Sequence, residues 1–177
     1  IGMHVHLSET KDEHEQCKER YGLTPAQILD CHHVWDSRAI AAHCVWLEPE
    51  DMKLLAKRGV SAVHCPVSNL KLGSGIADGV ASNNNLDLFE EIKAAALLAK
   101  GTHLDPTAVA APAALLMATV CGARAQGRQA ECGQIKLGMD ADLILLDFTQ
   151  PHLIPCHNVI SHLVYATSGH DVVMTMV

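Results

Sequence analysis

Two histidines and a glutamate near the start of the chain could carry out metal-assisted hydrolysis. His4 and His6 are two positions apart, which places both imidazoles on one face of a strand, and Glu9 follows just beyond the strand. An imidazole can bind a divalent metal ion, and a nearby carboxylate can carry a proton during hydrolysis. An isolated His-x-His pair is also typical of structural histidines, so both interpretations remain open at this point.

Two further histidines stand at the ends of apolar runs. His43 lies near the end of the run at residues 38–45, and His64 ends the run at residues 60–64. Because parallel-sheet proteins place working groups at strand ends, His43 is a candidate for the same site. His64 could instead only anchor the following loop. Histidines on segments expected to be helices or loops are predicted to be structural: His14, His32, His33 and His103.

Asp78 is a second candidate carboxylate. It precedes a glycine and a polar Ser-Asn-Asn run. A carboxylate there could bind a metal ion and accept a proton from water, but an Asp-Gly pair is also typical of a turn. The spacing alone favours the turn.

The elements that must position these residues alternate in the manner of a parallel α/β protein. Strand-like apolar runs at residues 4–7, 38–45 and 60–64 are separated by helical segments at residues 11–21 and 48–59. Short, nearly continuous apolar strands alternating with helices are typical of a sheet covered by helices.

Helix end signals support this division. Gly22 and Gly59 follow the last helical residues, where a left-handed C-cap glycine is expected. Thr24 is a plausible N-cap of a further helix, with Pro25 at its first position.

The second half of the chain changes character near Gly133. Helices are predicted from about residue 86 to 100 and from Asp105-Pro106 through Thr119, and strands at residues 141–147 and 172–177. We therefore expect two domains, residues 1–132 and a β-rich segment over residues 133–177.

Composition limits the classes of partner. Hydrophobic residues make up 49% of the 177 residues, which is typical of a globular chain. The net charge of −7, without a basic cluster, argues against nucleic acid and against an anionic membrane, and no apolar run has the length of a membrane span. The seven cysteines are irregularly spaced without a CxxC pair, which favours free thiols in a reducing cytoplasm over disulfides or a structural zinc module.

Several segments, read in order, resemble the amidohydrolase superfamily and, within it, the methylthioadenosine/S-adenosylhomocysteine deaminases. The resemblance runs across essentially the whole chain, and its most specific parts are Ser-Asn-Leu-Lys-Leu at residues 68–72 and Ala-Ser-Asn-Asn at residues 81–84. The segments that carry it are His6-Leu7-Ser8-Glu9-Thr10, Ala42-His43-Cys44-Val45, residues 64–77, residues 78–84 and Gly138-Met139-Asp140-Ala141-Asp142-Leu143.

The resemblance implies an α/β fold, a distorted (β/α)₈ TIM-type barrel of which this chain supplies roughly strands 5 to 8, with part of a small β-sandwich domain. It implies that His6 and Asp78 bind one Zn²⁺ (or Fe²⁺ or Mn²⁺) per subunit. Glu9, His43 and Asp78 would be catalytic, and Glu9 and His43 would also contact the substrate. Residues of lower rank for the site are His4, His64, Ser68 and Asn69.

The implied reaction is hydrolytic deamination of an adenosine thioether. Asp78 would take a proton from the attacking water, Glu9 would protonate a ring nitrogen, and His43 would stabilise charge on the attacking oxygen at C6. S-Adenosylhomocysteine or 5′-methylthioadenosine would yield the inosine analogue and ammonia. The partner is then a small purine nucleoside. The apolar helix after residue 86 and the β-rich segment could both support a homo-oligomer.

Alternative functions remain open at the sequence level. The same chemistry could act on guanine, 8-oxoguanine or a chlorotriazine, because the family's recognition residues lie mainly upstream of this sequence. A non-catalytic fragment is an alternative of another class. The family's strand-one His-x-His pair is absent, and two ligands are fewer than the three that zinc normally takes. The 177 residues alone are expected to bind zinc weakly and to deaminate nothing.

The sequence departs from the family pattern at one further point. The family has a helix and an apolar eighth strand where Ala77 here runs directly into Asp78. A deletion of both elements would expose strand edges and uncover apolar faces. We therefore predict a chain break or a long gap between these two residues.

Overall fold

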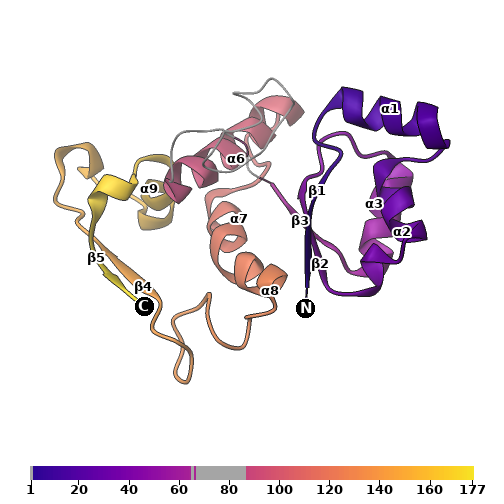
Figure 1. Cartoon of the computed structure of the whole chain (residues 1–177). Helices are drawn as coiled ribbons and strands as arrows, with labels where there is room; N and C mark the ends of the chain where they lie inside the picture. Colours follow the sequence, from indigo (N-terminus) through magenta and orange to yellow (C-terminus); the bar gives the residue numbers. More distant parts are fainter. Residues whose placement is uncertain (1, 65, 67–86) are drawn as a thin grey trace. The chain divides into compact units, whose positions relative to one another are not determined.

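A computed structural model of the chain describes residues 2–64, residue 66 and residues 87–177 (Figure 1). They fall into two compact units, one on each side of residues 67–86, and each is considered by itself. The predicted gap between Ala77 and Asp78 lies outside the described residues.

The first unit is built on a parallel sheet of three strands, β1 (Met3–Leu7), β2 (Ala39–His43) and β3 (Ser61–Val63), in the order β1-β2-β3. The strands alternate with helices α1 (Lys11–Tyr21), α2 (Pro25–Cys31) and α3 (Pro49–Arg58), with a short 3₁₀ helix, η1 (Val34–Asp36), before β2. All three α-helices lie to the same side of the sheet (Figure 1). The predicted strand–helix alternation and the α/β class are confirmed.

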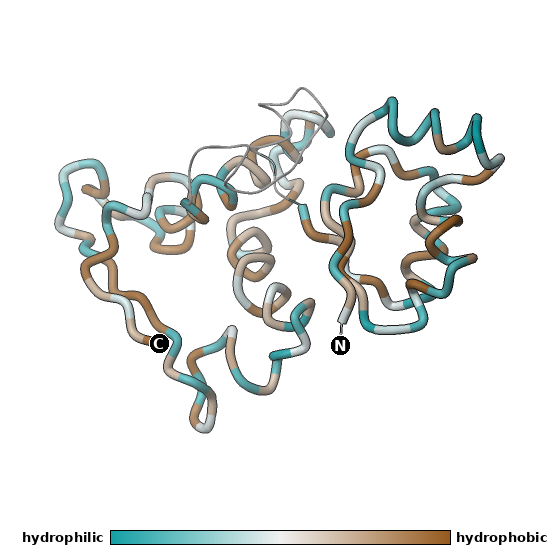
Figure 2. The backbone as a smooth tube through the Cα atoms, viewed as in Figure 1, coloured by the Kyte–Doolittle hydropathy of each residue, from teal (hydrophilic) through white to brown (hydrophobic). Residues whose placement is uncertain are grey.

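The core of this unit lies between the sheet and the helices. Figure 2 shows hydrophobic residues along the strands, whereas the residues of α1 are mainly hydrophilic. Within β1, Leu7 is buried while His4 and His6 are exposed, so the two histidines lie on the face opposite the core. The buried cluster comprises Leu7, Ala26, Trp35, Ala39, Ala41 and Leu55.

The predicted helix ends of the first unit are confirmed. Gly22 and Gly59 follow α1 and α3 in the left-handed conformation, with φ of 69° and 68°. Thr24 caps α2 in a capping box with Gln27, and Pro25 is its first residue. Local sequence signals therefore determine where these helices begin and end.

The second unit contains mostly helices and one antiparallel pair of strands. The strands predicted at residues 141–147 and 172–177 are present as β4 (Leu143–Leu146) and β5 (Val172–Met176), and the structure pairs them. The longest helix, α6 (Leu88–His103), packs with α7 (Ala111–Leu116) and α9 (Val159–Tyr165). The remaining elements are η2 (Met117–Cys121), α8 (Gly122–Gln126), η3 (Pro151–Leu153) and η4 (Gly169–Asp171).

The prediction that Asp105-Pro106 starts a helix is wrong. The Asp105 carboxylate accepts hydrogen bonds from the N–H and the hydroxyl of Thr107, at 2.8 and 2.7 Å, and closes a local turn. Helix α7 begins only at Ala111. An aspartate before a proline is equally suited to a turn and to an N-cap, and here the turn is formed.

The complete barrel and the domain boundary near Gly133 stay predictions.

Among the helices of residues 2–64 and 87–177, none has the combined length and apolarity needed to cross a bilayer.

Replacing Thr24 tests how strongly a buried cap stabilises the first unit. Its hydroxyl donates to the carboxylate of Asp51 at 2.6 Å, and both residues are buried. We expect Thr24→Ala to lower the free energy of unfolding by about 2–4 kcal/mol, because the cap and a partner of a buried carboxylate are lost together.

Urea unfolding measures this effect, and Thr24→Ser, which keeps the hydroxyl, should stay within about 1 kcal/mol of the wild type. The matched comparison is Thr10→Ala, which removes the less buried cap of α1 and should cost about 1 kcal/mol. Equal losses in Thr24→Ala and Thr10→Ala would show that the contact with Asp51 adds nothing.

Candidate metal and catalytic site

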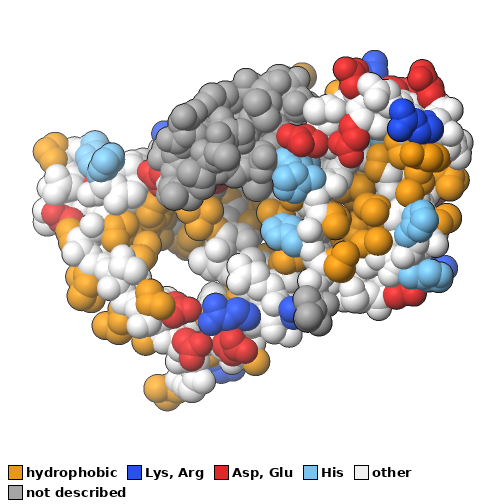
Figure 3. Space-filling view, in the orientation of Figure 1, with side chains coloured by type: hydrophobic (Ala, Val, Ile, Leu, Met, Phe, Trp, Pro, Cys, Tyr) orange, Lys and Arg blue, Asp and Glu red, His pale blue; other side chains and the backbone are white. Residues whose placement is uncertain are grey.

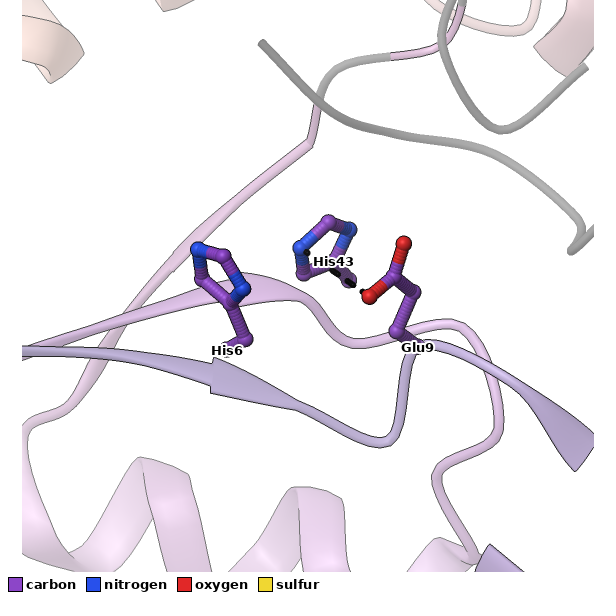
Figure 4. A group of neighbouring side chains, drawn as sticks. All are labelled: His6, Glu9 and His43. Atoms are coloured by element: carbon purple, nitrogen blue, oxygen red, sulfur yellow. Dashed lines mark ion pairs between the residues drawn. The ribbon is translucent and has the colours of Figure 1, made fainter. Parts of the chain in front are cut away.

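The parallel pairing of β1 with β2 brings the candidate residues together. His6 lies opposite Ala42 and Leu7 lies opposite His43, so both strands end at the same level. Glu9 lies two residues beyond the end of β1. Figure 4 shows the side chains of His6, Glu9 and His43 gathered at this edge of the sheet.

The three side chains lie within reach of one another. Nε2 of His43 is 3.8 Å from Oε2 of Glu9, and the rings of His6 and His43 meet edge to face with centroids 4.8 Å apart. The His43 side chain has no exposed area, that of Glu9 is 22% exposed, and His6 is exposed. Figure 3 shows histidine and acidic side chains next to one another on the surface of this unit. One residue of the site is thus fixed by burial while the other two face solvent.

The backbone at the two strand ends adopts an unusual conformation. Ser8, His43 and Cys44 have φ of 47°, 73° and 55°, a left-handed region that non-glycine residues seldom adopt. Hydrogen bonds across the two ends hold this conformation. The Leu7 carbonyl accepts from the Cys44 N–H, and the Ser8 carbonyl accepts from the Val45 and Trp46 N–H groups. The segments that carry Glu9 and His43 are therefore tied directly to each other.

Two residues next to the site, His64 and Cys44, have shifted pKa values. Partial desolvation lowers the pKa of His64, although the residue keeps exposed surface, and its hydrogen bond to the His43 backbone opposes that shift. Burial raises the pKa of Cys44 to about 11. At neutral pH this thiol is therefore protonated.

The donor atoms fit a divalent metal ion. The possible ligand atoms of His6, Glu9 and His43 lie within 4.8 Å of one another, the sole such group of three found in the described part of the chain. Imidazole nitrogen and carboxylate oxygen suit zinc and are also accepted by iron and manganese. The donor set is thus compatible with a metal centre at this edge.

The structure places only some of the residues singled out from the sequence. It brings together His6, Glu9 and His43, whose roles stay predictions. His4 shares the exposed face of β1 with His6 but does not belong to the three-residue group. His64 follows β3 beside His43. Three further candidates, Ser68, Asn69 and Asp78, lie outside the described residues.

One residue in this region was not singled out from the sequence. His14, predicted to be structural, is buried in α1 and contacts Ser8, which directly precedes Glu9. The only signal for it is that His14 and Cys17, three positions apart, lie on the least charged side of a charged helix. That spacing predicts burial but gives no information about the partner.

Comparisons with known proteins identify similar chains. The model of the amidohydrolase family matches residues 1–177. The 5-methylthioadenosine/S-adenosylhomocysteine deaminase of Moorella thermoacetica is 47% identical over 188 residues, which covers 97% of this chain and 44% of that protein. The 5′-deoxyadenosine deaminase of Methanosarcina mazei is 47% identical over 192 residues, with coverages of 99% and 44%.

Among solved structures, an adenosine deaminase from Xanthomonas campestris with bound zinc has a TM-score of 0.95 and 39% identity. The match covers 100% of this chain and 44% of that one. The chain therefore spans less than half the length of these three proteins.

Zinc binding by the 177-residue chain tests the donor set. We expect weak binding in isothermal titration calorimetry, because the family resemblance predicts only two protein ligands here, His6 and Asp78, and a zinc site normally has at least three. His6→Ala should weaken it by at least about tenfold. His32→Ala removes an exposed histidine after α2 and should leave the affinity unchanged. Stoichiometric zinc that resists a chelator would contradict the expectation of a weak site.

Proposed function

The chain belongs to the amidohydrolase family, and from that membership we propose that it is part of a metal-dependent deaminase of adenosine thioethers. The substrate would be S-adenosylhomocysteine or 5′-methylthioadenosine, and the products the inosine analogue and ammonia. The observation that carries this proposal is the meeting of His6, Glu9 and His43 at the carboxyl ends of two neighbouring parallel strands. Parallel α/β enzymes bind substrates at this edge of the sheet.

His6 and Asp78 would hold the metal ion, one per subunit. Zinc is favoured by the donor chemistry and by the zinc bound to the similar deaminase from Xanthomonas campestris. When bound, zinc supplies Lewis acidity that lowers the pKa of water towards neutrality.

The residues of this chain would divide the proton transfers between them. Asp78 accepts the proton of the attacking water. Glu9, partly exposed and 3.8 Å from His43, delivers a proton to the adenine ring nitrogen. His43, held rigidly by burial at the end of β2, stabilises the charge that develops on the attacking oxygen. Asp78 then passes its proton to the 6-amino group, which leaves as ammonia, and the C6 hydroxyl returns a proton to Glu9 as the carbonyl forms.

The names of the relatives support an adenosine substrate altered at the 5′ position. Those from Moorella thermoacetica and Methanosarcina mazei are named for methylthioadenosine, S-adenosylhomocysteine and 5′-deoxyadenosine. Such substrates share the adenine C6 amine and differ in the 5′ substituent. The names of the relatives therefore agree on the adenine C6 amine as the reacting group, and they differ in the 5′ substituent of the nucleoside.

We also propose a cytoplasmic location and a homo-oligomer as the working form. The described cysteines are all free thiols, which suits a reducing compartment. The apolar residues of α6 and the β4–β5 pair offer surfaces for self-association. No nucleic acid or membrane partner is proposed.

A chimera tests the reaction with a complete metal site. The 177 residues replace the matching part of the Moorella thermoacetica deaminase, which supplies the remaining 56% of that protein. We expect release of ammonia from methylthioadenosine and S-adenosylhomocysteine, no ammonia from guanine or 8-oxoguanine, and no chloride from a chlorotriazine. The 177-residue chain alone should release neither ammonia nor chloride from any of these compounds.

Within the chimera, Glu9→Gln should lower kcat by about 10²- to 10⁴-fold, because the amide cannot carry the proton. Glu19→Gln, an exposed change on α1, is the matched control and should leave kcat unchanged. A folded, zinc-loaded chimera that turns over no adenosine thioether would overturn the proposed substrate class. Full activity of Glu9→Gln would overturn the role of Glu9.

A further inference from the structure

The imidazole of His14 lies between the two loops that follow β1 and β2. His14 is 4% exposed and is the buried residue of α1, whose sequence is otherwise mainly charged. Its Nδ1 atom is 3.4 Å from the hydroxyl of Ser8, and its Nε2 atom is 3.4 Å from Oε1 of Glu48. One ring therefore contacts both loops, one through each nitrogen.

The first contact reaches the turn that carries Glu9. Ser8 is fully buried, has a left-handed backbone and directly precedes Glu9. Its carbonyl accepts hydrogen bonds from the N–H groups of Val45 and Trp46, just after His43. A buried hydroxyl without a hydrogen-bond partner is destabilising, so His14 favours the side-chain position that accompanies this backbone conformation.

The second contact reaches the loop after His43. Glu48 occupies the N-cap position of α3, and its backbone N–H donates to the carboxylate of Asp51 at 3.0 Å. Hydrogen bonds from Lys18 and from His14 hold the pKa of Glu48 below its usual range. Glu48 is therefore a charged acceptor at neutral pH, and a charged acceptor strengthens the contact with the ring.

The first turn of α1 also holds Glu9 by another route. The Glu9 backbone N–H donates to the carboxylate of Glu13 at 2.9 Å. That bond links Glu9 only to the helix that follows it, whereas the ring of His14 links the Glu9 turn to the loop that follows His43. A change at His14 can therefore alter the contact between the two loops while the hydrogen bond from Glu9 to Glu13 stays intact.

We propose that His14 is a positioning residue for the site: through its contact with Ser8 it sets the spacing between Glu9 and His43, while its contact with Glu48 orients the ring. The catalytic consequence rests on the proposed deaminase function, but the positioning itself does not. An apolar side chain of similar volume would fill the same space and lose both contacts.

Three variants separate the two contacts from simple filling of space. His14→Leu removes both polar atoms. His14→Asn places an amide group near the position of Nδ1 and can reach Ser8, whereas His14→Gln places its amide near the position of Nε2 and can reach Glu48. The readout is amide hydrogen exchange, followed by NMR, of Val45 and Trp46, whose N–H groups bind the Ser8 carbonyl. Urea unfolding of each variant reports the change in global stability.

We expect exchange at Val45 and Trp46 to rise by at least about tenfold in His14→Leu, beyond any change at Ala41 in the centre of β2. His14→Asn should restore wild-type exchange at both amides, and His14→Gln should not. His32→Asn, which changes an exposed histidine, is the control and should alter neither amide.

Two results would overturn the proposal. One is exchange in His14→Leu that rises equally at Ala41, Val45 and Trp46, which would mean that His14 only supports the core. The other is identical exchange at Val45 and Trp46 in His14→Asn and His14→Gln, which would mean that the contact with Ser8 has no effect. This comparison is decisive even when His14→Leu does not fold.

Activity of the chimera distinguishes this proposal from the proposed function. In an active chimera, His14→Leu should lower kcat at least about tenfold with KM within about twofold, and His14→Asn should recover kcat. An unchanged kcat would overturn the catalytic consequence of the positioning. A zinc-loaded chimera without deaminase activity counts against the proposed function alone, because the exchange experiment decides the position of His14 without any turnover.

Discussion

The first unit depends on the parallel register of β1 against β2. Pairing Leu7 with His43 makes both strands end at one level, so the residues just beyond them share one edge of the sheet. A shift by one residue would turn His6 towards the core and Leu7 towards solvent, because side chains alternate along a strand. Burial of Leu7 and of alternate residues of β2 therefore stabilises the same register that brings His6, Glu9 and His43 together.

Holding those side chains in place requires a backbone that is unfavourable by itself. Ser8, His43 and Cys44 all have positive φ, and cross-strand hydrogen bonds to the Leu7 and Ser8 carbonyls maintain it. Strain of this kind persists where the surrounding structure determines it strongly, and such places are often functional. Here α1 and the N-cap of α3 supply that surrounding structure, since His14 and Glu48 contribute side chains to the network behind the Glu9 turn.

Much of the fold could be predicted because its signals are local. Gly22, Thr24 and Gly59 mark helix ends through their own backbone preferences, and the apolar runs mark the strands. Asp105 shows the limit of such signals, since its carboxylate suits a turn as well as an N-cap. The candidates His6, Glu9 and His43 also came from the sequence, but through strand ends and a family resemblance. The contacts of His14 could not be predicted, because its partners Ser8 and Glu48 lie outside its helix.

The sequence by itself determined the α/β class, the positions of most strands and helices, the family and the types of donor atom available for a metal ion. Only the tertiary structure decided that Glu9 and His43 lie 3.8 Å apart and that His14 joins the loops behind them. The physical reason is that propensity, capping and alternation act over a few neighbouring residues. Distances between strand ends depend instead on register, on buried contacts and on hydrogen bonds between residues far apart in the chain.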